Sequence, residues 1–434
     1  MTDRIEHDSM GEVRVPAQAL YGAQTQRAVN NFQIAPRMMP ARFIGALALL
    51  KAAAARANKA VGALDPGLAG AIADAADTVA GGAHAGEFPV SVFQTGSGTS
   101  SNMNMNEVLA QLAGRSIQRP VHSNDHVNCS QSSNDIIPSA IAVAAVLALR
   151  DTLQPALAGL RGVLQQRAPE LEDVVKTGRT HLMDATPVTL GFELRTWDAQ
   201  LLECEQRLAE LQPRLRALAI GGSAVGTGIN VPPGYSVALL EALSAATGCL
   251  FTGAAMPSSR MAAQDGSVEC SGALRGLAIV LIKMSNDLRW MGSGPLAGLG
   301  EIQLQALQPG SSIMPGKVNP VLPEAVLMAA TEVLGNDATV TLAGQSGNFQ
   351  LNVMLPLIAD KLLSSIELLG GACAALASCV AGLVPCREHA AATLARNPVL
   401  VTALNPLIGY EAAAAIAKRA LREGRTVLDV AAED

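Results

Sequence analysis

The sequence predicts an all-α protein built from long, closely packed helices. Apolar residues make up 49% of the 434 residues, whereas aromatic residues make up only 3%. A core of Ala, Leu, Gly and Val suits packed helices better than sheets. Several long segments keep the helical spacing of apolar residues, and we find no alternation of strands with helices. These observations together favour a helical bundle.

The overall composition narrows the possible partners and the compartment. Charged residues make up only 16% of the chain, so we expect much of its surface to be buried, between subunits. The formal net charge is −6 and no basic run is present, so we expect no nucleic-acid partner. The seven cysteines include no CxxC pair, as in reduced cytosolic proteins. Residues 1–13 lack an apolar core, so we expect no signal peptide and a cytoplasmic location.

Helical periodicity covers most of the chain after residue 40. Residues 1–40 mix Gly, Pro and polar residues with short apolar pieces, so we expect them to be irregular. Helical patterns then cover 43–61, 67–81, a segment from a polar cap near 99 to 112, 138–163 with Pro138 in its first turn, and 190–218. The remaining predicted helices are 267–291, 325–342 and 352–383, followed by shorter helices within 389–434.

One helical segment raises the question of a membrane. Residues 368–386 contain no charge and are about long enough to span a bilayer. They are rich in Gly, Ala, Ser and Cys, and no second span accompanies them. We therefore expect a buried bundle helix and no membrane partner.

Polar segments interrupt the helices at several places and are the candidates for a site. They are 96–104 taken with 130–135, then 178–187, and then 310–324, and each is rich in small hydrogen-bonding residues. Any one of these segments alone is explained by helix caps and turns. Together they form one pocket if the long helices bring their ends together. The glycine-rich segment 221–234 lacks a following GK[ST] and a preceding strand, so we reject a phosphate-binding loop there.

The segment 310–324, GSSIMPGKVNPVLPE, carries the strongest signal. Its prolines and glycines cannot continue a helix, so we expect a loop between long helices, where binding and catalytic residues often lie. An ordinary connector has no need of Ser311, Ser312, Lys317 and Asn319 together. The segment also matches, at every fixed position, the pattern GSSxMPxKxNPxxxE of the fumarase/aspartase superfamily, which it resembles.

The resemblance extends over residues 5–430. GSGTSSNMNMNE (96–107) and VNCSQSSND (127–135) are similar to the first conserved region, and GRTHLMDATP (178–187) is similar to the second. The sequences of these motifs resemble those of class II fumarases. The reaction of that family is the reversible anti-addition of water to fumarate, giving (S)-malate, in the tricarboxylic acid cycle. The resemblance implies a small dicarboxylate substrate and neither cofactor nor metal.

The resemblance also implies an architecture. It implies an N-terminal domain over 1–131, a central long-helix bundle over 132–388 and a small C-terminal domain over 389–434 that is short compared with relatives. Such chains form a homotetramer with a core of 20 helices. Each of the three conserved regions in one pocket then comes from a different subunit.

Residue roles follow from the family's motifs. The resemblance assigns Ser311 as the base at C3, and His181 with Glu324 as the group that handles water at C2. Lys317 and loop N–H groups suit the aci-carboxylate intermediate, which needs preorganised donors. The implied substrate contacts are Ser97, Gly98, Thr99, Ser132, Ser133, Asn134, Thr180, Ser312, Lys317, Val318 and Asn319.

A second dicarboxylate site is implied near the pocket entrance. Its residues are Arg119, His122, Ser123, Asn124 and Asp125. His122, Asp125 and His126 on one turn also permit a metal site, but no distant ligand is evident, so we expect none.

The chain departs from the family pattern at a few positions. Ser123 stands where the family usually has Pro, Phe192 where it usually has Gln, and Cys129 where it often has Lys. Residues 258–261, SSRM, lack the FEA sequence that the family shows there. Phe192 is the departure that bears on the polarity of the pocket.

Two other functions stay open. An aspartate ammonia-lyase shares the fold and the spelling NPVLPE, but aspartases place Gln at the position of His181. A catalytically silent scaffold is the alternative of another class, and the presence of Ser311, Lys317 and His181 disfavours it.

Overall fold

The computed structural model describes residues 3–433. The chain divides into two compact units. The first comprises Met1–Leu153, Arg207–Arg275 and Glu332–Glu367, and the second comprises Gln154–Gln206, Gly276–Thr331 and Leu368–Asp434. Helices dominate both units, which confirms the predicted all-α class, and several long helices supply residues to both.

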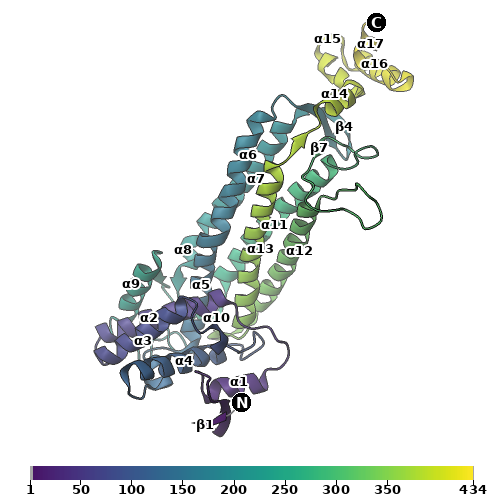
Figure 1. The fold of residues 1–434 in the computed structure, drawn as a ribbon. Helices are drawn as coiled ribbons and strands as arrows, with labels where there is room; N and C mark the ends of the chain where they lie inside the picture. The colour runs from purple at the N-terminus through teal and green to yellow at the C-terminus, as the bar shows by residue number, and fades with distance from the viewer. Residues whose placement is uncertain (1–2, 434) are drawn as a thin grey trace. The chain divides into compact units, whose positions relative to one another are not determined.

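The first unit contains most of the shorter helices. Its complete elements are β1 (Asp3–Asp8), β2 (Gly11–Pro16), α1 (Ala23–Asn31), α2 (Ala41–Ala60), α3 (Pro66–Ala80), η1 (Ala85–Glu87), α4 (Thr99–Ile117), η2 (Ser123–Val127), α5 (Ser133–Ala148), η3 (Leu149–Leu153), α8 (Gln212–Leu215), β5 (Ala217–Leu218), α9 (Tyr235–Thr247), β6 (Thr252–Gly253), α10 (Pro257–Ala262), β8 (Gly347–Asn348) and β9 (Leu351–Asn352). Its core rests on α2, which packs against α3, α5 and α9 (Figure 1). The predictions of helices at 43–61 and 67–81 are confirmed.

The prediction that residues 1–40 are irregular is wrong. Strands β1 and β2 pair antiparallel, and α1 follows them. Arg4 stabilises the hairpin because its guanidinium donates to the backbone carbonyls of Pro16, Ala19 and Tyr21. Those bonds link residues far apart in sequence, so local spacing does not reveal them.

Helix α5 begins earlier than predicted, and Pro138 lies inside it. Ser132 is its N-cap residue, so Pro138 is not in the first turn. A π-helical turn, η3, then joins α5 to α6, and the helical stretch ends at Glu170. The predicted polar cap of α4 comes from residues before the N-cap position: Gly98 directly precedes the helix, and the side chains of Thr95 and Gln94 accept the N–H groups of Ser100 at 3.1 Å and Ser101 at 2.9 Å.

The second unit contains the larger part of the long-helix bundle. Its elements are α6 (Gln154–Glu170), β3 (Val175–Thr180), β4 (Met183–Thr189), α7 (Leu190–Glu210), α11 (Asp265–Met291), β7 (Ile302–Gln303), α12 (Val321–Gly344), α13 (Leu355–Ala381), β10 (Val384–Pro385), α14 (Arg387–Ala395), η4 (Pro398–Leu404), α15 (Asn405–Ile408), α16 (Tyr410–Glu423) and α17 (Val427–Ala431). Four of these helices are divided between the units: residues 207–210 of α7, 265–275 of α11, 332–344 of α12 and 355–367 of α13 belong to the first unit. Helices α6, α7, α11, α12 and α13 run alongside one another (Figure 1). The predictions at 267–291, 325–342 and 352–383 are confirmed within a few residues.

Two predictions in this region need correction. The segment 178–187 is not a simple break between helices, because most of it lies in the antiparallel strands β3 and β4. The predicted helix 190–218 ends at Glu210, and the short helix α8 and strand β5 follow. Pro213 at the start of α8 favours a new helix over continuation of α7.

The apolar helices are mostly buried. Two helical stretches, 133–170 and Leu355–Ala381, have the length and composition of a membrane span, and 72% and 56% of their most apolar windows are buried. A core helix passes the same test of length and composition. The uncharged segment 368–386, which raised the question of a membrane span, lies largely within α13. The C-terminal helices α16 and α17 form their own small core with Val401.

Candidate active site

The N-terminus of α5 holds three predicted substrate contacts in a hydrogen-bonded turn. The side chain of Ser132 accepts the N–H of Asn134 at 3.2 Å, and the N–H of Ser132 donates to Asp135 Oδ1 at 3.0 Å. This capping box fixes the backbone at the start of the helix. The side chain of Ser133 accepts a hydrogen bond from Asn102 Nδ2 at 3.2 Å.

The glycine-rich segment 221–234 packs onto this turn. Ser223 N–H donates to Asp135 Oδ2 at 3.0 Å, and Asn134 Nδ2 donates to the carbonyl of Ala224 at 2.8 Å. Burial raises the pKa of the Asp135 carboxyl to about 6, and the N–H bonds from Ser132 and Ser223 oppose that shift. The segment therefore helps to hold the first polar region in place.

A buried polar network lies beneath the same turn. Lys51 is fully buried, and its Nζ donates to Asn128 Oδ1 at 3.1 Å and Gln131 Oε1 at 2.9 Å. Asn128 Oδ1 also accepts from Asn102 and Asn106. Burial lowers the pKa of the Lys51 ammonium to about 7, and the charge of Asp135 opposes that shift.

Ser97 and Gly98 lie in the turn before α4, and Thr99 is the first residue of that helix. The hydroxyls of Ser97 and Thr99 lie 2.8 Å apart and hydrogen-bond. Gly98 has a φ of +73°, and a Cβ there would lie 2.8 Å from Cγ2 of Ile137. Only glycine suits both constraints, so this turn packs closely against α5.

Thr180 and His181 lie at the exposed tip of the β3–β4 hairpin. Thr180 pairs with Met183, and the two residues between them have positive φ, 56° for His181 and 61° for Leu182. This is the backbone of a two-residue type I′ turn, which normally prefers Asn, Asp or Gly. Non-glycine residues held in this region concentrate at functional sites.

The loop 310–320 is held by its own backbone and by Asn319. Gly310 N–H donates to the Lys317 carbonyl at 2.8 Å, and Asn319 Nδ2 donates to the Gly310 carbonyl at 2.7 Å. The prediction of a loop is confirmed up to Pro320, after which α12 begins at Val321.

Ser311 sits inside this loop, facing two backbone donors. Its Oγ accepts the N–H groups of Ile313 at 3.2 Å and Met314 at 3.1 Å. Ser311 is half-buried, whereas Ser312, Lys317 and Val318 are exposed. Two N–H dipoles directed at one hydroxyl oxygen stabilise negative charge on it.

Glu324 lies in the first turn of α12. No hydrogen bond or ion pair within residues 3–433 joins it to His181. The implied pairing of these two residues therefore stays a prediction that a single chain does not display.

The second predicted site borders a cavity in the first unit. His122, Ser123 and Asn124 line a cavity of about 370 Å³, together with residues of β1 and α4. Arg119 instead pairs with Asp65 at 2.7 Å, and Asp125 lies 3.1 Å from His122 Nδ1.

The metal alternative at this turn gains no support from the geometry. His122 Nδ1 accepts the N–H of Asp125, and His126 Nδ1 accepts the N–H of His122. One nitrogen of each imidazole is therefore already in use. In the described part of the chain, no three His, Cys, Asp or Glu side chains converge to hold a metal.

Sequence reasoning missed the residues that support the site. Lys51 and Asn58 stand seven residues apart in an otherwise Ala-rich helix, and both are completely buried. Asn58 binds the backbone of Cys129 and the hydroxyl of Ser130. Polar residues seven apart lie on one face of a helix, so this spacing was the available signal.

Comparison with known proteins identifies the class. Residues 11–335 match the family described as Lyase, and residues 400–434 match the one described as Fumarase C C-terminus. The match to the lyase family covers more than half of the chain, so the protein is a lyase.

Individual relatives narrow the family. The chain is 56% identical to a class II fumarate hydratase of Xylella fastidiosa, over 99% of this chain and 91% of that protein. It is 55% identical to "Fumarate hydratase class II 2" of Pseudomonas aeruginosa, over 100% and 95%. Its fold matches a crystal structure of class II fumarase from Schistosoma mansoni with a TM-score of 0.97 and 37% identity, covering 100% and 95%. The chain belongs to the class II fumarate hydratase family.

Proposed function

We propose that this protein catalyses the reversible addition of water to fumarate, giving (S)-malate, with Ser311 as the base at C3. The observation that carries the proposal is the pair of N–H groups, from Ile313 and Met314, directed at Ser311 Oγ. Serine is too weak an acid to act as a base unaided, and these donors favour its alkoxide. In dehydration the alkoxide removes the C3 proton, and in hydration the hydroxyl returns it.

The remaining groups supply charge and water chemistry. Removal of a proton beside a carboxylate places a second negative charge on that group. Lys317 and Asn319 of the same loop are suited to hold this aci-carboxylate. His181, with Glu324 as the partner that raises its basicity, removes a proton from water as its oxygen bonds to C2, and protonates the leaving hydroxide in the reverse reaction.

The substrate contacts are proposed from three polar regions. Ser97, Thr99, Ser132, Ser133 and Asn134 offer hydroxyl and amide donors for one carboxylate, and Thr180 and Ser312 add donors from the other regions. Gly98 and Val318 contribute through the backbone. Asn102 already occupies a lone pair of the Ser133 oxygen, which leaves the Ser133 O–H free to donate to a carboxylate.

A homotetramer with composite pockets is part of the proposal. In the second unit Ile279, Trp290 and Met328 are large apolar residues of bundle helices, yet each is more than half exposed. Apolar faces of this kind favour helix packing between subunits. The three-part division at residues 131 and 388, the cytoplasmic location and a role in the tricarboxylic acid cycle without cofactor or metal are also proposed. So is a secondary dicarboxylate site at the cavity beside His122.

The test is an assay of fumarate loss by ultraviolet absorbance, with and without ammonium. We expect loss in buffer alone, with malate as the product. Loss only with ammonium would establish the ammonia-lyase, which NPVLPE at 319–324 favours, and no loss in either case would leave the scaffold.

A further inference from the structure

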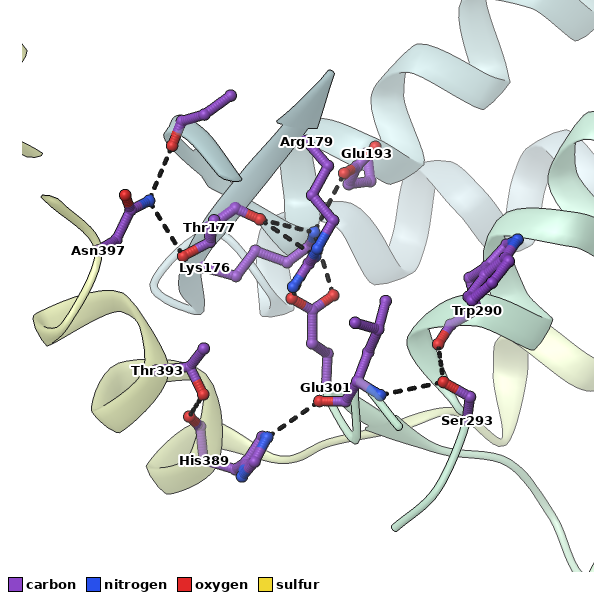
Figure 2. Close-up of polar contacts among 12 residues, drawn as sticks. Lys176, Thr177, Arg179, Glu193, Trp290, Ser293, Glu301, His389, Thr393 and Asn397 are labelled. Carbon is purple, nitrogen blue, oxygen red and sulfur yellow. Dashed lines mark hydrogen bonds and ion pairs between the residues drawn. The ribbon is translucent and has the colours of Figure 1, made fainter. Parts of the chain in front are cut away.

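A buried cluster of charges lies along strand β3 of the β3–β4 hairpin (Figure 2). Two cations of β3 converge on one carboxylate: Arg179 Nη1 lies 2.7 Å from Glu301 Oε1, and Lys176 Nζ lies 3.2 Å from Glu301 Oε2. Glu193 of α7 is 3.3 Å from Lys176 Nζ. The side chains of Glu301 and Lys176 are each only 4% exposed. Two cations thus face two anions in the interior.

A buried cluster of this kind is a weak source of stability. Removing charges from water costs about as much as their attraction returns, and apolar replacements are often equally stable. What the cluster supplies is a fixed geometry, because Arg179 donates a hydrogen bond to Glu301 Oε1 while Lys176 of the same strand faces Oε2 as an ion pair without a hydrogen bond. His181 of the proposed active site lies in the turn directly after this strand and needs such a fixed position.

The backbone that carries Glu301 is itself anchored. Its N–H donates to the Met291 carbonyl at 2.8 Å, and its carbonyl accepts from Cys386 N–H at 2.9 Å. The preceding loop is tied to α14, because His389 Nε2 donates to the Leu299 carbonyl at 2.9 Å (Figure 2). Glu301 also precedes β7, from which the chain runs to the Ser311 loop.

The tip of the hairpin, in contrast, has little support of its own. His181 is exposed, and within residues 3–433 no hydrogen bond of its side chain is present. Asn397 joins the two strands near their base by donating to Ala185 O at 2.9 Å and to Thr177 Oγ1 at 3.4 Å. The position of His181 therefore depends on how the base of the hairpin is held.

We propose that Glu301 is a positioning residue for hydration, acting through Arg179 and Lys176 on His181. Arg179 stands two residues before His181, directly after a register shift in the β3–β4 pairing. A Cβ at Gly178, in that shift, would lie 2.4 Å from the Thr186 carbonyl, so the strand is closely packed there. Glu301 touches neither substrate nor reacting atoms. This inference rests on the proposed function.

The test is a double-mutant cycle of Glu301→Gln with His181→Asn, assayed as fumarate hydration. In the His181 background we expect Glu301→Gln to lower kcat about 10- to 100-fold with less than about a threefold change in KM, as for a displaced catalytic group. In the His181→Asn background the same change should cost less than about threefold. An equal loss in both backgrounds would mean a structural role and would overturn the proposal.

Two further variants guard the interpretation. Glu301→Asp keeps the charge and the fold if Glu301→Gln does not fold, and its shorter side chain should lower kcat about tenfold, again only with His181 present. Wild-type kcat in Glu301→Asp would overturn the proposal. Glu193→Gln is the matched control, because Lys176 then keeps Glu301, and its kcat should stay within about threefold of wild type.

The proposal on Glu301 and the proposed function fail in different ways. A wild-type protein without hydratase activity, or a His181→Asn variant with wild-type rate, would overturn the function or the role of His181, and the Glu301 proposal with it. A His181-dependent enzyme in which Glu301→Gln acts equally in both backgrounds would overturn the Glu301 proposal alone.

Discussion

The start of α5 and the loop 310–320 carry different halves of the proposed chemistry and are built in opposite ways. Ser132, Ser133 and Asn134 each bond to residues elsewhere in the first unit or in their own cap, above a network that includes the fully buried Lys51. In the loop, the hydrogen bonds of residues 311–318 stay within the segment 310–319, counting all residues from 3 to 433. Most of its side chains are exposed.

This difference shows that the start of α5 is preorganised for binding, whereas the loop 310–320 is only partly so. The turn at the start of α5, which we propose to bind a carboxylate, is fixed by its own unit before any ligand arrives, so it costs little to order on binding. The Ser311 loop fixes only a local turn around its hydroxyl, and we expect substrate, or a partner subunit in the proposed tetramer, to order the rest of it. Regions with few buried contacts open at low free energy.

The largest expected effect is that of Ser311→Ala. We expect kcat for hydration to fall about 10³- to 10⁴-fold, because the base is lost. Dicarboxylate binding, measured by calorimetry, should change little, because the α5 turn is intact. A variant with near-wild-type rate would remove Ser311 from the base role.

The next effect is that of His181→Asn, which should lower kcat about 100-fold. Asparagine accepts the positive φ of this position, so the turn should persist. The matched control is His84→Asn, because His84 also has a positive φ, of 60°, and lies outside the proposed site. Equal activity of the two variants would make His181 structural.

The buried network predicts a pH-dependent stability. Burial lowers the pKa of Lys51 to about 7 in the folded protein, against an ordinary value of 10.5 for lysine. Between these values the unfolded chain binds more protons, so the free energy of unfolding should rise with pH, by about 2–3 kcal/mol from pH 7 to pH 9. From about one pH unit below 7 downward, both states hold the Lys51 proton and its destabilising contribution is constant.

Denaturant unfolding at the two pH values measures this rise. Lys51→Met should abolish it, whereas Lys59→Met, at an exposed position of the same helix, should keep it. Burial raises the pKa of Asp135 to about 6 in the folded protein, against an ordinary value of 3.8. Its contribution to the free energy of unfolding therefore falls as pH rises, and it does so between about pH 4 and pH 6, below the range in which Lys51 acts. An unchanged rise in Lys51→Met would contradict the assignment.

The smallest effect concerns the orientation of Ser133. Asn102→Ala removes the donor to the Ser133 oxygen, and we expect KM to rise about five- to tenfold with kcat within about threefold. Asn106→Ala is the matched control, because Asn106 donates to Asn128 but not to Ser133. A similar rise of KM in the control would show that network stability, and not Ser133, sets substrate binding.

The parts of the fold that follow from local spacing could be predicted from the sequence. The long helices show regular apolar spacing, and the prolines and glycines of 310–320 exclude a helix. The β1–β2 and β3–β4 hairpins were missed because their strands are short and Arg4 and Glu301 hold them from a distance. The start of α5 was misplaced because Pro138 resembled a first-turn proline, although Ser132 and Asp135 form the cap.

In the candidate site too, some residues could be predicted from sequence motifs and others could not. The family motifs named Ser311, His181 and Ser133, but the supporting residues were missed. Lys51 and Glu301 act through contacts with residues distant in sequence, Asn128 for one and Arg179 for the other. Such contacts leave no local pattern, apart from charges in apolar surroundings.

Hydrogen exchange of the full protein, followed by mass spectrometry with and without fumarate, tests the comparison most directly. We predict that the amides of 312–318 exchange at least about 100-fold faster than those of 134–140 without ligand, and that fumarate slows the loop while leaving the α5 segment unchanged. A loop as protected as α5 before ligand is added would contradict the account, because its order would then be stored in the protein alone.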